Sequence, residues 1–149
     1  MHFVEFGAGK GHLTLRLYET LKMPTSCILV DRMKLKFKCE NKVLDREAAM
    51  KDIKRITADI RHLNISGVEL IKPKGHVFGM SKHLCGAATD LTLRCLVNTL
   101  QSDQVFSGVA IAVCCHHRCT WDDYVAKEYF TDTLVIYLFI CYYSSTTRC

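Results

Sequence analysis

The sequence lacks an apolar run long enough to cross a bilayer as a helix. Its longest such run, LVIYLFICYY, covers residues 134–143, whereas a membrane helix needs about 20 residues. No internal repeat, low-complexity linker or signal peptide is recognisable in the 149 residues. We therefore expect neither a membrane-bound nor a secreted protein, but an intracellular one (cytoplasm or nucleus) of single-domain length.

Charge is moderate as well. Charged residues make up 23% and hydrophobic residues 49% of the chain, which excludes a disordered polar chain and allows a packed core. Twenty Lys and Arg oppose 15 Asp and Glu, a net charge of +5. This balance is compatible with a nucleic-acid partner and equally with an enzyme for a neutral substrate, and it leaves the oligomeric state open.

Cysteine, by contrast, is abundant. The nine cysteines are an odd number, and several lie in apolar runs or beside histidines. A secreted disulfide scaffold would be shorter and richer in loops. We therefore expect reduced thiols that mostly serve as buried apolar residues.

Short apolar runs alternate with segments of helical periodicity. The expected strands are 2–6, 27–31, 55–60, 76–80 and 109–114, and the expected helices are 11–22, about 45–54, 87–100 and 121–130. Leu13, Leu17 and Leu21 are expected on one face of the first helix. Such alternation predicts an α/β fold with a mainly parallel sheet.

The two ends fit this pattern less well. Met1 stands almost on the first strand, and the segment after Phe130, TDTLVIYLFICYYSSTTRC, is rich in β-branched and aromatic residues. It is either a sixth strand or an unrelated tail. We favour the tail on an incomplete domain, because doubly wound domains usually contain more strands and helices. The expected division is a partial domain at 1–130 and a divergent hydrophobic tail at 131–149.

Three glycines follow the first expected strand in the stretch VEFGAGKGHLT. Gly7, Gly9 and Gly11 lie between strand and helix, where backbone N–H groups can approach a ligand. A nicotinamide fingerprint, G-x-G-x-x-G, would need glycine where His12 stands. With Glu5, the pattern is E-x-G-x-G-x-G, which looks like the first motif of Rossmann-type methyltransferases that use S-adenosylmethionine.

Two further acids follow expected strand ends. Asp31 ends the second strand, where a carboxylate can accept both ribose hydroxyls. Asp59 ends the third, where the methyltransferase pattern places an acid near the adenine. Each alone is more often a helix cap or turn residue. Together with the loop they predict a cofactor site formed by Glu5, Gly7, Gly9, Gly11, Asp31 and Asp59.

Two unusual segments complete a family resemblance. SKHLCGAATD (81–90) and CCHHRCTW (114–121) follow the last two strands and, with VEFGAGKGHLT and LVDR, resemble the tRNA 2′-O-methyltransferase family that modifies the fourth acceptor-stem nucleotide (the Trm-thirteen type). The resemblance covers about residues 3–130. It implies a Rossmann-type fold, S-adenosylmethionine as cofactor and tRNA as partner. The family also implies zinc-binding modules before this domain and more sheet after it, which leaves the activity of this short chain open.

Methyl transfer to a ribose hydroxyl needs in-line alignment and a group that takes the proton or stabilises the alkoxide. Lys82, His83 and His117 stand at the appropriate strand ends. We expect His83 or Lys82 on the side of the nucleophile, and His117 or Arg118 on the ribose or a phosphate. Alternatively, these side chains only form hydrogen bonds between loops.

Basic residues also follow the second strand. Lys34, Lys36 and Lys38 share one face of an extended segment. They are candidates for binding tRNA phosphates, although such a run is more often a solvated face.

The density of cysteine and histidine suggests a metal alternative. The possible ligands are Cys85, Cys114, Cys115, His116, His117 and Cys119. A structural zinc site usually offers paired ligands from two separate knuckles. Because the first cysteines here close an apolar strand, we expect no metal.

The sequence thus favours an S-adenosylmethionine-dependent tRNA ribose methyltransferase domain in an incomplete form. A non-catalytic product that keeps cofactor or RNA binding is the second reading. A nicotinamide-dependent oxidoreductase is the third, and His12 argues against it.

Overall fold

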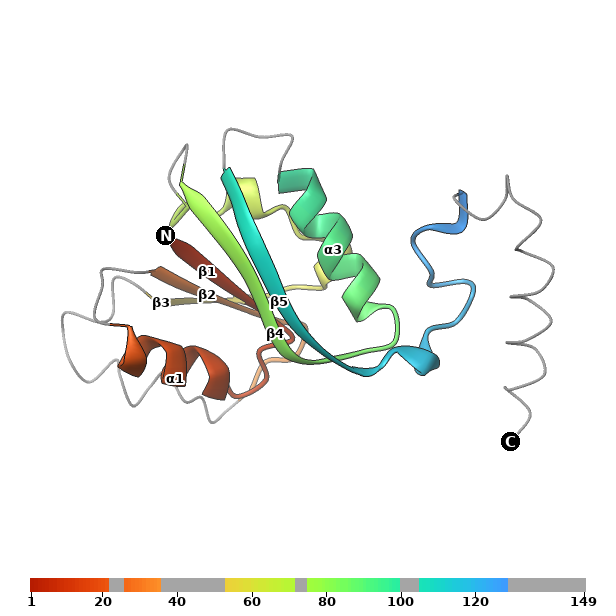
Figure 1. Ribbon diagram of the computed structural model, residues 1–149, viewed down its shortest axis with the longest axis horizontal. Helices are drawn as coiled ribbons and strands as arrows, with labels where there is room; N and C mark the ends of the chain where they lie inside the picture. Colours follow the sequence, from red (N-terminus) through yellow and green to blue (C-terminus); the bar gives the residue numbers. More distant parts are fainter. Residues whose placement is uncertain (22–25, 36–52, 72–74, 100–104, 129–149) are drawn as a thin grey trace.

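The computed structural model describes residues 1–21, 26–35, 53–71, 75–99 and 105–128 (Figure 1). In this part of the chain, five parallel strands form one sheet in the order β3-β2-β1-β4-β5. The strands are β1 (His2–Phe6), β2 (Ser26–Asp31), β3 (Ile53–Thr57), β4 (His76–Cys85) and β5 (Val105–Cys115). The helices are α1 (His12–Thr20) and α3 (Ala88–Thr99), with 3₁₀ turns η2 (Ile60–His62), η3 (Ile65–Gly67) and η4 (His116–Arg118). The predicted α/β class with a parallel sheet is confirmed.

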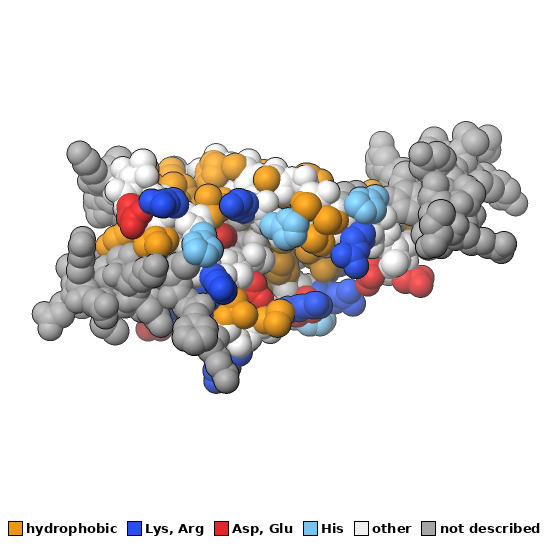
Figure 2. All heavy atoms as spheres, turned by 90° about the horizontal axis from the view of Figure 1, so that it is seen from below, with side chains coloured by type: hydrophobic (Ala, Val, Ile, Leu, Met, Phe, Trp, Pro, Cys, Tyr) orange, Lys and Arg blue, Asp and Glu red, His pale blue; other side chains and the backbone are white. Residues whose placement is uncertain are grey.

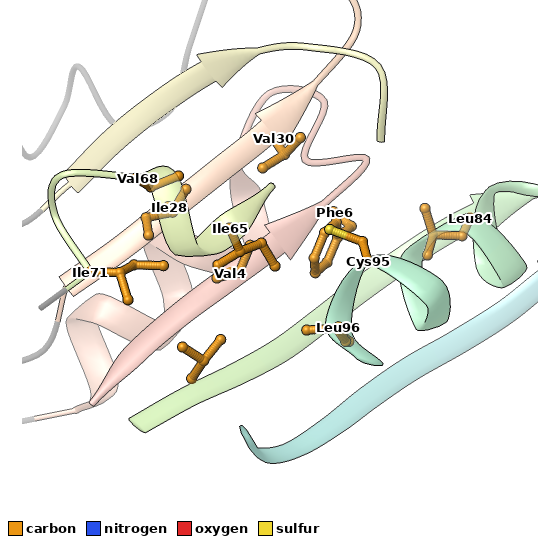
Figure 3. Packing of buried hydrophobic residues seen from close by; sticks show 11 residues of the cluster. Val4, Phe6, Ile28, Val30, Ile65, Val68, Ile71, Leu84, Cys95 and Leu96 are labelled. Atoms are coloured by element: carbon orange, nitrogen blue, oxygen red, sulfur yellow. The ribbon is translucent and has the colours of Figure 1, made fainter. Parts of the chain in front are cut away.

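The central strands are buried on both faces, as their continuous apolar runs predict. Alternate residues of β2 enter two separate clusters: Ile28 and Val30 pack with α3 and η3, whereas Cys27 and Leu29 pack on the side of α1. Figure 3 shows the larger cluster, in which Phe6 of β1 lies beside Cys95 and Leu96 of α3. In Figure 1, α1 and α3 accordingly cover opposite faces of the sheet.

The first strand lies in the middle of the sheet. β1 pairs with β2 on one side and with β4 on the other. β1 therefore has no unpaired edge. Among the described strands the outer ones are β3 and β5, and β5 exposes Val105, Val109 and Val113.

Leu13 and Leu17 lie one turn apart on α1, and both are half-buried. The residues that pack against the cluster on this side of the sheet are Leu15 and Tyr18, also half-buried, and Thr14 is the buried residue of the helix. The reason is a polar contact described below, which turns the Thr14 side of the helix toward the sheet.

Several predicted boundaries are also wrong. The third strand is β3, so Asp59 lies beyond its end, and residues 53–54 of the expected helix at 45–54 belong to that strand. β4 and β5 are longer than expected, which places Lys82 and Cys115 within strands instead of in the following loops.

The expected helix at 121–130 is wrong over residues 121–126, which form turns, and there the rings of Trp121 and Tyr124 stack with centroids 6.1 Å apart. Residues 127–128 are helical, as expected. The remaining predictions for 45–52 and for the tail at 131–149 fall outside the described residues.

Candidate functional site

The glycine stretch forms a tight turn between β1 and α1. Gly9 and Gly11 have φ values of 51° and 81°, a left-handed conformation that favours glycine. Gly11 is the N-cap of α1. A Cβ built on Gly9 would meet no protein atom within 4 Å. The turn therefore leaves open space beside the Gly9 backbone, which a ligand can approach closely.

Gly9 is held from two neighbouring strands. Its N–H donates to Oδ2 of Asp31 at 2.8 Å, and its carbonyl accepts from Nη1 of Arg55 at 2.9 Å. The other carboxylate oxygen of Asp31 accepts from the N–H of Met33 at 2.8 Å. Asp31 thus lies against the glycine turn, as predicted. Arg55 was missed by sequence reasoning, and its only signal was a basic residue at the start of the expected strand 55–60.

Glu5 anchors the helix that follows the turn. Its carboxylate is buried, with 3% of the residue exposed. Oε2 accepts from the backbone N–H of Thr14 at 3.0 Å and also from the Thr14 hydroxyl. That N–H is one of the donors in the first turn of α1 without a partner inside the helix. These contacts orient α1 and the turn, so Glu5 supports the candidate site from within the fold.

Of the two roles considered for Asp59, an acid near the adenine or a helix cap, the structure shows the helix cap. Its Oδ1 accepts from the N–H of Arg61 at 2.8 Å, which makes Asp59 the N-cap of η2. Asp59 is exposed. It remains near the site, because the N–H of neighbouring Ala58 donates to the carbonyl of Asp31 at 3.0 Å.

The end of β4 approaches the glycine turn. A Cβ built on Gly7 would lie 3.0 Å from Cδ2 of Leu84 and 3.5 Å from the carbonyl oxygen of His83. The register between β4 and β5 slips just here: Ser81 pairs with Ile111 and Leu84 with Val113. This irregularity gives β4 one extra residue around Lys82 and His83, both of which are exposed. Such bulges redirect side chains and are frequent next to active sites.

The segments after β4 and β5 meet. The N–H of Gly86 donates to the carbonyl of Cys115 at 3.0 Å. A Cβ on Gly86 would lie 3.3 Å from the carbonyl oxygen of Arg118. His117 and Arg118 belong to η4, directly after β5, and both are exposed. The structure therefore brings the glycine turn, the end of β4 and η4 to one edge of the sheet.

The basic run after β2 is described only in part. Lys34 is exposed and lies three residues after Asp31. Lys36 and Lys38 lie outside the described residues. Figure 2 shows Lys, Arg and His side chains on the face seen from below, with carboxylates interspersed among them.

The cysteines that the structure describes divide into two groups. Cys27, Cys95 and Cys119 are buried, as expected, whereas Cys85 and Cys115 are half-buried and Cys114 is exposed. The expectation of an apolar, buried end of β5 is therefore wrong. Within the described ranges, no group of three or more His, Cys, Asp or Glu residues has the arrangement of a metal site.

Comparison with known proteins gives consistent matches. The family model for Methyltransferase TRM13 matches residues 1–144. A relative from Dictyostelium discoideum, the tRNA:m(4)X modification enzyme TRM13 homolog, is 37% identical over 90% of this chain and 26% of its own length. The human relative of the same name is 34% identical over 86% of this chain and 34% of its own length. The Saccharomyces cerevisiae tRNA:m(4)X modification enzyme TRM13 is 31% identical over 92% of this chain and 36% of its own length.

The chain thus spans about a quarter to a third of the length of these relatives. No solved structure matches it significantly. Among the helices that the structure describes, none has the length and apolar character needed to cross a membrane.

Proposed function

The chain belongs to the TRM13 methyltransferase family, and from this premise we propose that it is the cofactor-binding part of a tRNA ribose 2′-O-methyltransferase. The contact that carries the proposal is the one between Gly9 and Asp31. It places a carboxylate at the end of β2 beside a turn that leaves open space. The names of the relatives supply the substrate class, tRNA, and the resemblance of the motifs supplies the acceptor stem and the 2′-hydroxyl.

S-adenosylmethionine is the cofactor that these residues fit. The open space at Gly9 admits a ligand against the backbone, and the carboxylate of Asp31 is a natural acceptor for a pair of ribose hydroxyls. The remaining cofactor residues that we propose are Gly7, Gly11 and Asp59, with Glu5 holding the turn through Thr14. When bound, the cofactor supplies a methyl group on a sulfonium, which is a strong electrophile.

Lys82, His83 and His117 are the proposed groups at the methyl-transfer end. His83 lies closest to the glycine turn through its backbone, and its Nε2 is 3.5 Å from Sγ of Cys85. A neutral imidazole there can accept the proton of a ribose hydroxyl, while the ammonium of Lys82 can stabilise the developing alkoxide. His117, on η4, is available to orient the ribose.

tRNA is the proposed partner. Lys34 and Arg118 are exposed and flank the site after β2 and after β5. Contacts of such cations to phosphates would give affinity that falls as salt increases. The Lys and Arg side chains on the face shown in Figure 2 are available for this role, and we extend it to Lys36 and Lys38 from the sequence. A tRNA substrate and free thiols are both in keeping with an intracellular location.

The same contacts would serve a non-catalytic product that binds cofactor or RNA. This reading is the second candidate, because none of these contacts by itself requires methyl transfer. The nicotinamide alternative has lost its support, because the family match is to methyltransferases.

Calorimetric titration of the chain with S-adenosylhomocysteine tests the cofactor site. We expect binding, and we expect Asp31→Ala to weaken it at least about tenfold, since hydrogen bonds to a charged group are worth about 1.5–3 kcal/mol. Asp122→Ala, at an exposed position, is the control and should bind as the parent does. A folded chain that does not bind, or binds equally well without Asp31, contradicts the assignment.

Methylation of unmodified tRNA then separates the two candidate functions. Incorporation of label from S-adenosylmethionine that is lost in His83→Ala supports the enzyme. Binding of cofactor without any incorporation supports the non-catalytic product.

A further inference from the structure

Three thiols converge at the ends of β4 and β5. Cys85 and Cys115 are the last residues of the two strands and are register partners in the sheet. The hydrogen bond from the Gly86 N–H to the Cys115 carbonyl ties their backbones together. Neighbouring strands lie about 4.8 Å apart, which falls within the Cα separation of about 4.4–6.8 Å that disulfides require.

A β-bulge adds the third thiol. Leu84 pairs with Val113 and Cys85 with Cys115, so Cys114 is the extra residue on β5. In a regular strand, neighbouring side chains point to opposite faces. Here the bulge brings Sγ of Cys114 within 3.2 Å of Sγ of Cys115. Cys115 therefore has one thiol neighbour on its own strand and another on β4.

The electrostatics differ among the three thiols. Hydrogen bonds with the thiols of Cys114 and Cys85, and the charge of Arg118, lower the pKa of Cys115. The same contacts with Cys115 raise the pKa of Cys85 and of Cys114. Cys115 is thus the one of the three thiols that loses its proton most readily. Thiolate character governs attack on disulfides.

These thiols are also accessible, unlike the remaining described ones. Cys114 is exposed and its two neighbours are half-buried, whereas Cys27 and Cys95 are buried. Burial raises the pKa of Cys95 to about 11. The protein therefore contains its own unreactive reference thiols.

We propose that Cys85, Cys114 and Cys115 form a thiol–disulfide exchange site, at which a low-molecular-weight disulfide such as oxidised glutathione closes a Cys85–Cys115 bond between β4 and β5. The Cys115 thiolate attacks one sulfur of the disulfide, forms a mixed disulfide and releases one glutathione thiolate. The Cys85 thiol then loses its proton, attacks the Cys115 sulfur and releases the second glutathione. The two protein thiols are oxidised, and one glutathione disulfide is reduced to two glutathione thiols that take up the two protons.

This site does not depend on the proposed methyl transfer, although it lies beside it. Sγ of Cys85 contacts the His83 ring, and η4 begins immediately after Cys115. Closing the bond would remove the Cys85 thiol proton beside the His83 ring. It would also link the two segments that carry the proposed methyl-transfer residues.

Mass spectrometry after incubation with oxidised glutathione and alkylation of the remaining thiols tests the proposal. We expect the loss of two hydrogen atoms, with Cys85 linked to Cys115 between the tryptic peptides 83–94 and 95–118. Cys85→Ser should stop the reaction at a glutathione adduct on Cys115, and Cys85→Ala provides a second variant should the first fold poorly. Cys114→Ser should still form the bond.

Three results would overturn the proposal. One is a Cys114–Cys115 bond that persists in both Cys85 variants. The second is equal oxidation of Cys27 and Cys95, since exchange would then not be selective. The third is the absence of any oxidation at Cys115 in the folded parent chain.

Discussion

The Gly9 N–H donates to Oδ2 of Asp31 at 2.8 Å, so the end of β2 holds the turn that follows β1. The carboxylate that we expect to bind a ribose is thereby also the group that shapes the loop around the ligand. Asp31 can both bind the ribose and hold the turn, because the carboxyl ends of parallel strands lie at one edge of the sheet. Loss of Asp31 should therefore affect both the contact and the turn.

Arg55 is expected to position the same turn. Arg55→Met removes the 2.9 Å hydrogen bond from a charged guanidinium to the Gly9 carbonyl, a contact worth about 1.5–3 kcal/mol, of which part reaches the ligand through the turn. We expect S-adenosylhomocysteine affinity in calorimetry to fall about two- to tenfold. Lys54→Met is the matched control, since it removes one positive charge from the same strand at a side chain paired with Glu69. An equal loss in both variants would show a general charge effect and contradict a positioning role.

Gly9→Ala separates folding from ligand binding. The new methyl meets no protein atom, so the cost in the free energy of unfolding is the left-handed backbone penalty of about 1–2 kcal/mol. The methyl would occupy the proposed ligand space, and we expect more than about a tenfold loss of affinity. Gly67→Ala also meets no atom and lies in η3, so its affinity should not change. Unchanged affinity in a folded Gly9→Ala protein would place the ligand elsewhere.

The contact between Glu5 and Thr14 should stabilise the fold. Thr14→Val keeps the side-chain shape but removes the hydroxyl donor from a buried carboxylate, at a cost of about 1–3 kcal/mol in urea unfolding. In a Glu5→Gln background, Thr14→Val should lower the free energy of unfolding by less, because the carboxylate that accepts the hydrogen bond from the hydroxyl is then a neutral amide. A double-mutant cycle with no coupling would show that the hydroxyl contact contributes nothing.

The reactivity of Cys115 should depend on pH in a defined direction. Hydrogen bonds with the Cys114 and Cys85 thiols and the charge of Arg118 lower its pKa, so the thiolate forms below the ordinary value of 9.0. The iodoacetamide rate at Cys115 should therefore rise at lower pH than the rate at Cys95, whose pKa is about 11. At neutral pH we expect a difference of more than about tenfold.

Arg118→Ala should move the Cys115 profile toward higher pH, because the positive charge favours the thiolate. Identical profiles for Cys115 and Cys95 would be incompatible with this electrostatic account. Because both thiols lie on the 95–118 peptide, fragmentation of that peptide by tandem mass spectrometry is needed to locate the label.

The sequence by itself determined the features that depend on local chemistry. Apolar runs placed the buried strands, and the glycines marked a turn whose left-handed φ values favour that residue. Asp31 followed from its place at a strand end. These properties are visible because each depends on a few neighbouring residues.

Only the tertiary structure decided the contacts that depend on strand pairing. Arg55 reaches Gly9 across 46 residues, and Thr14 faces the sheet because Glu5 is buried beneath it. The bulges at His83 and Cys114 arise from the mutual register of β4 and β5. No single strand encodes that register, since it is set by the packing of both strands on a common core.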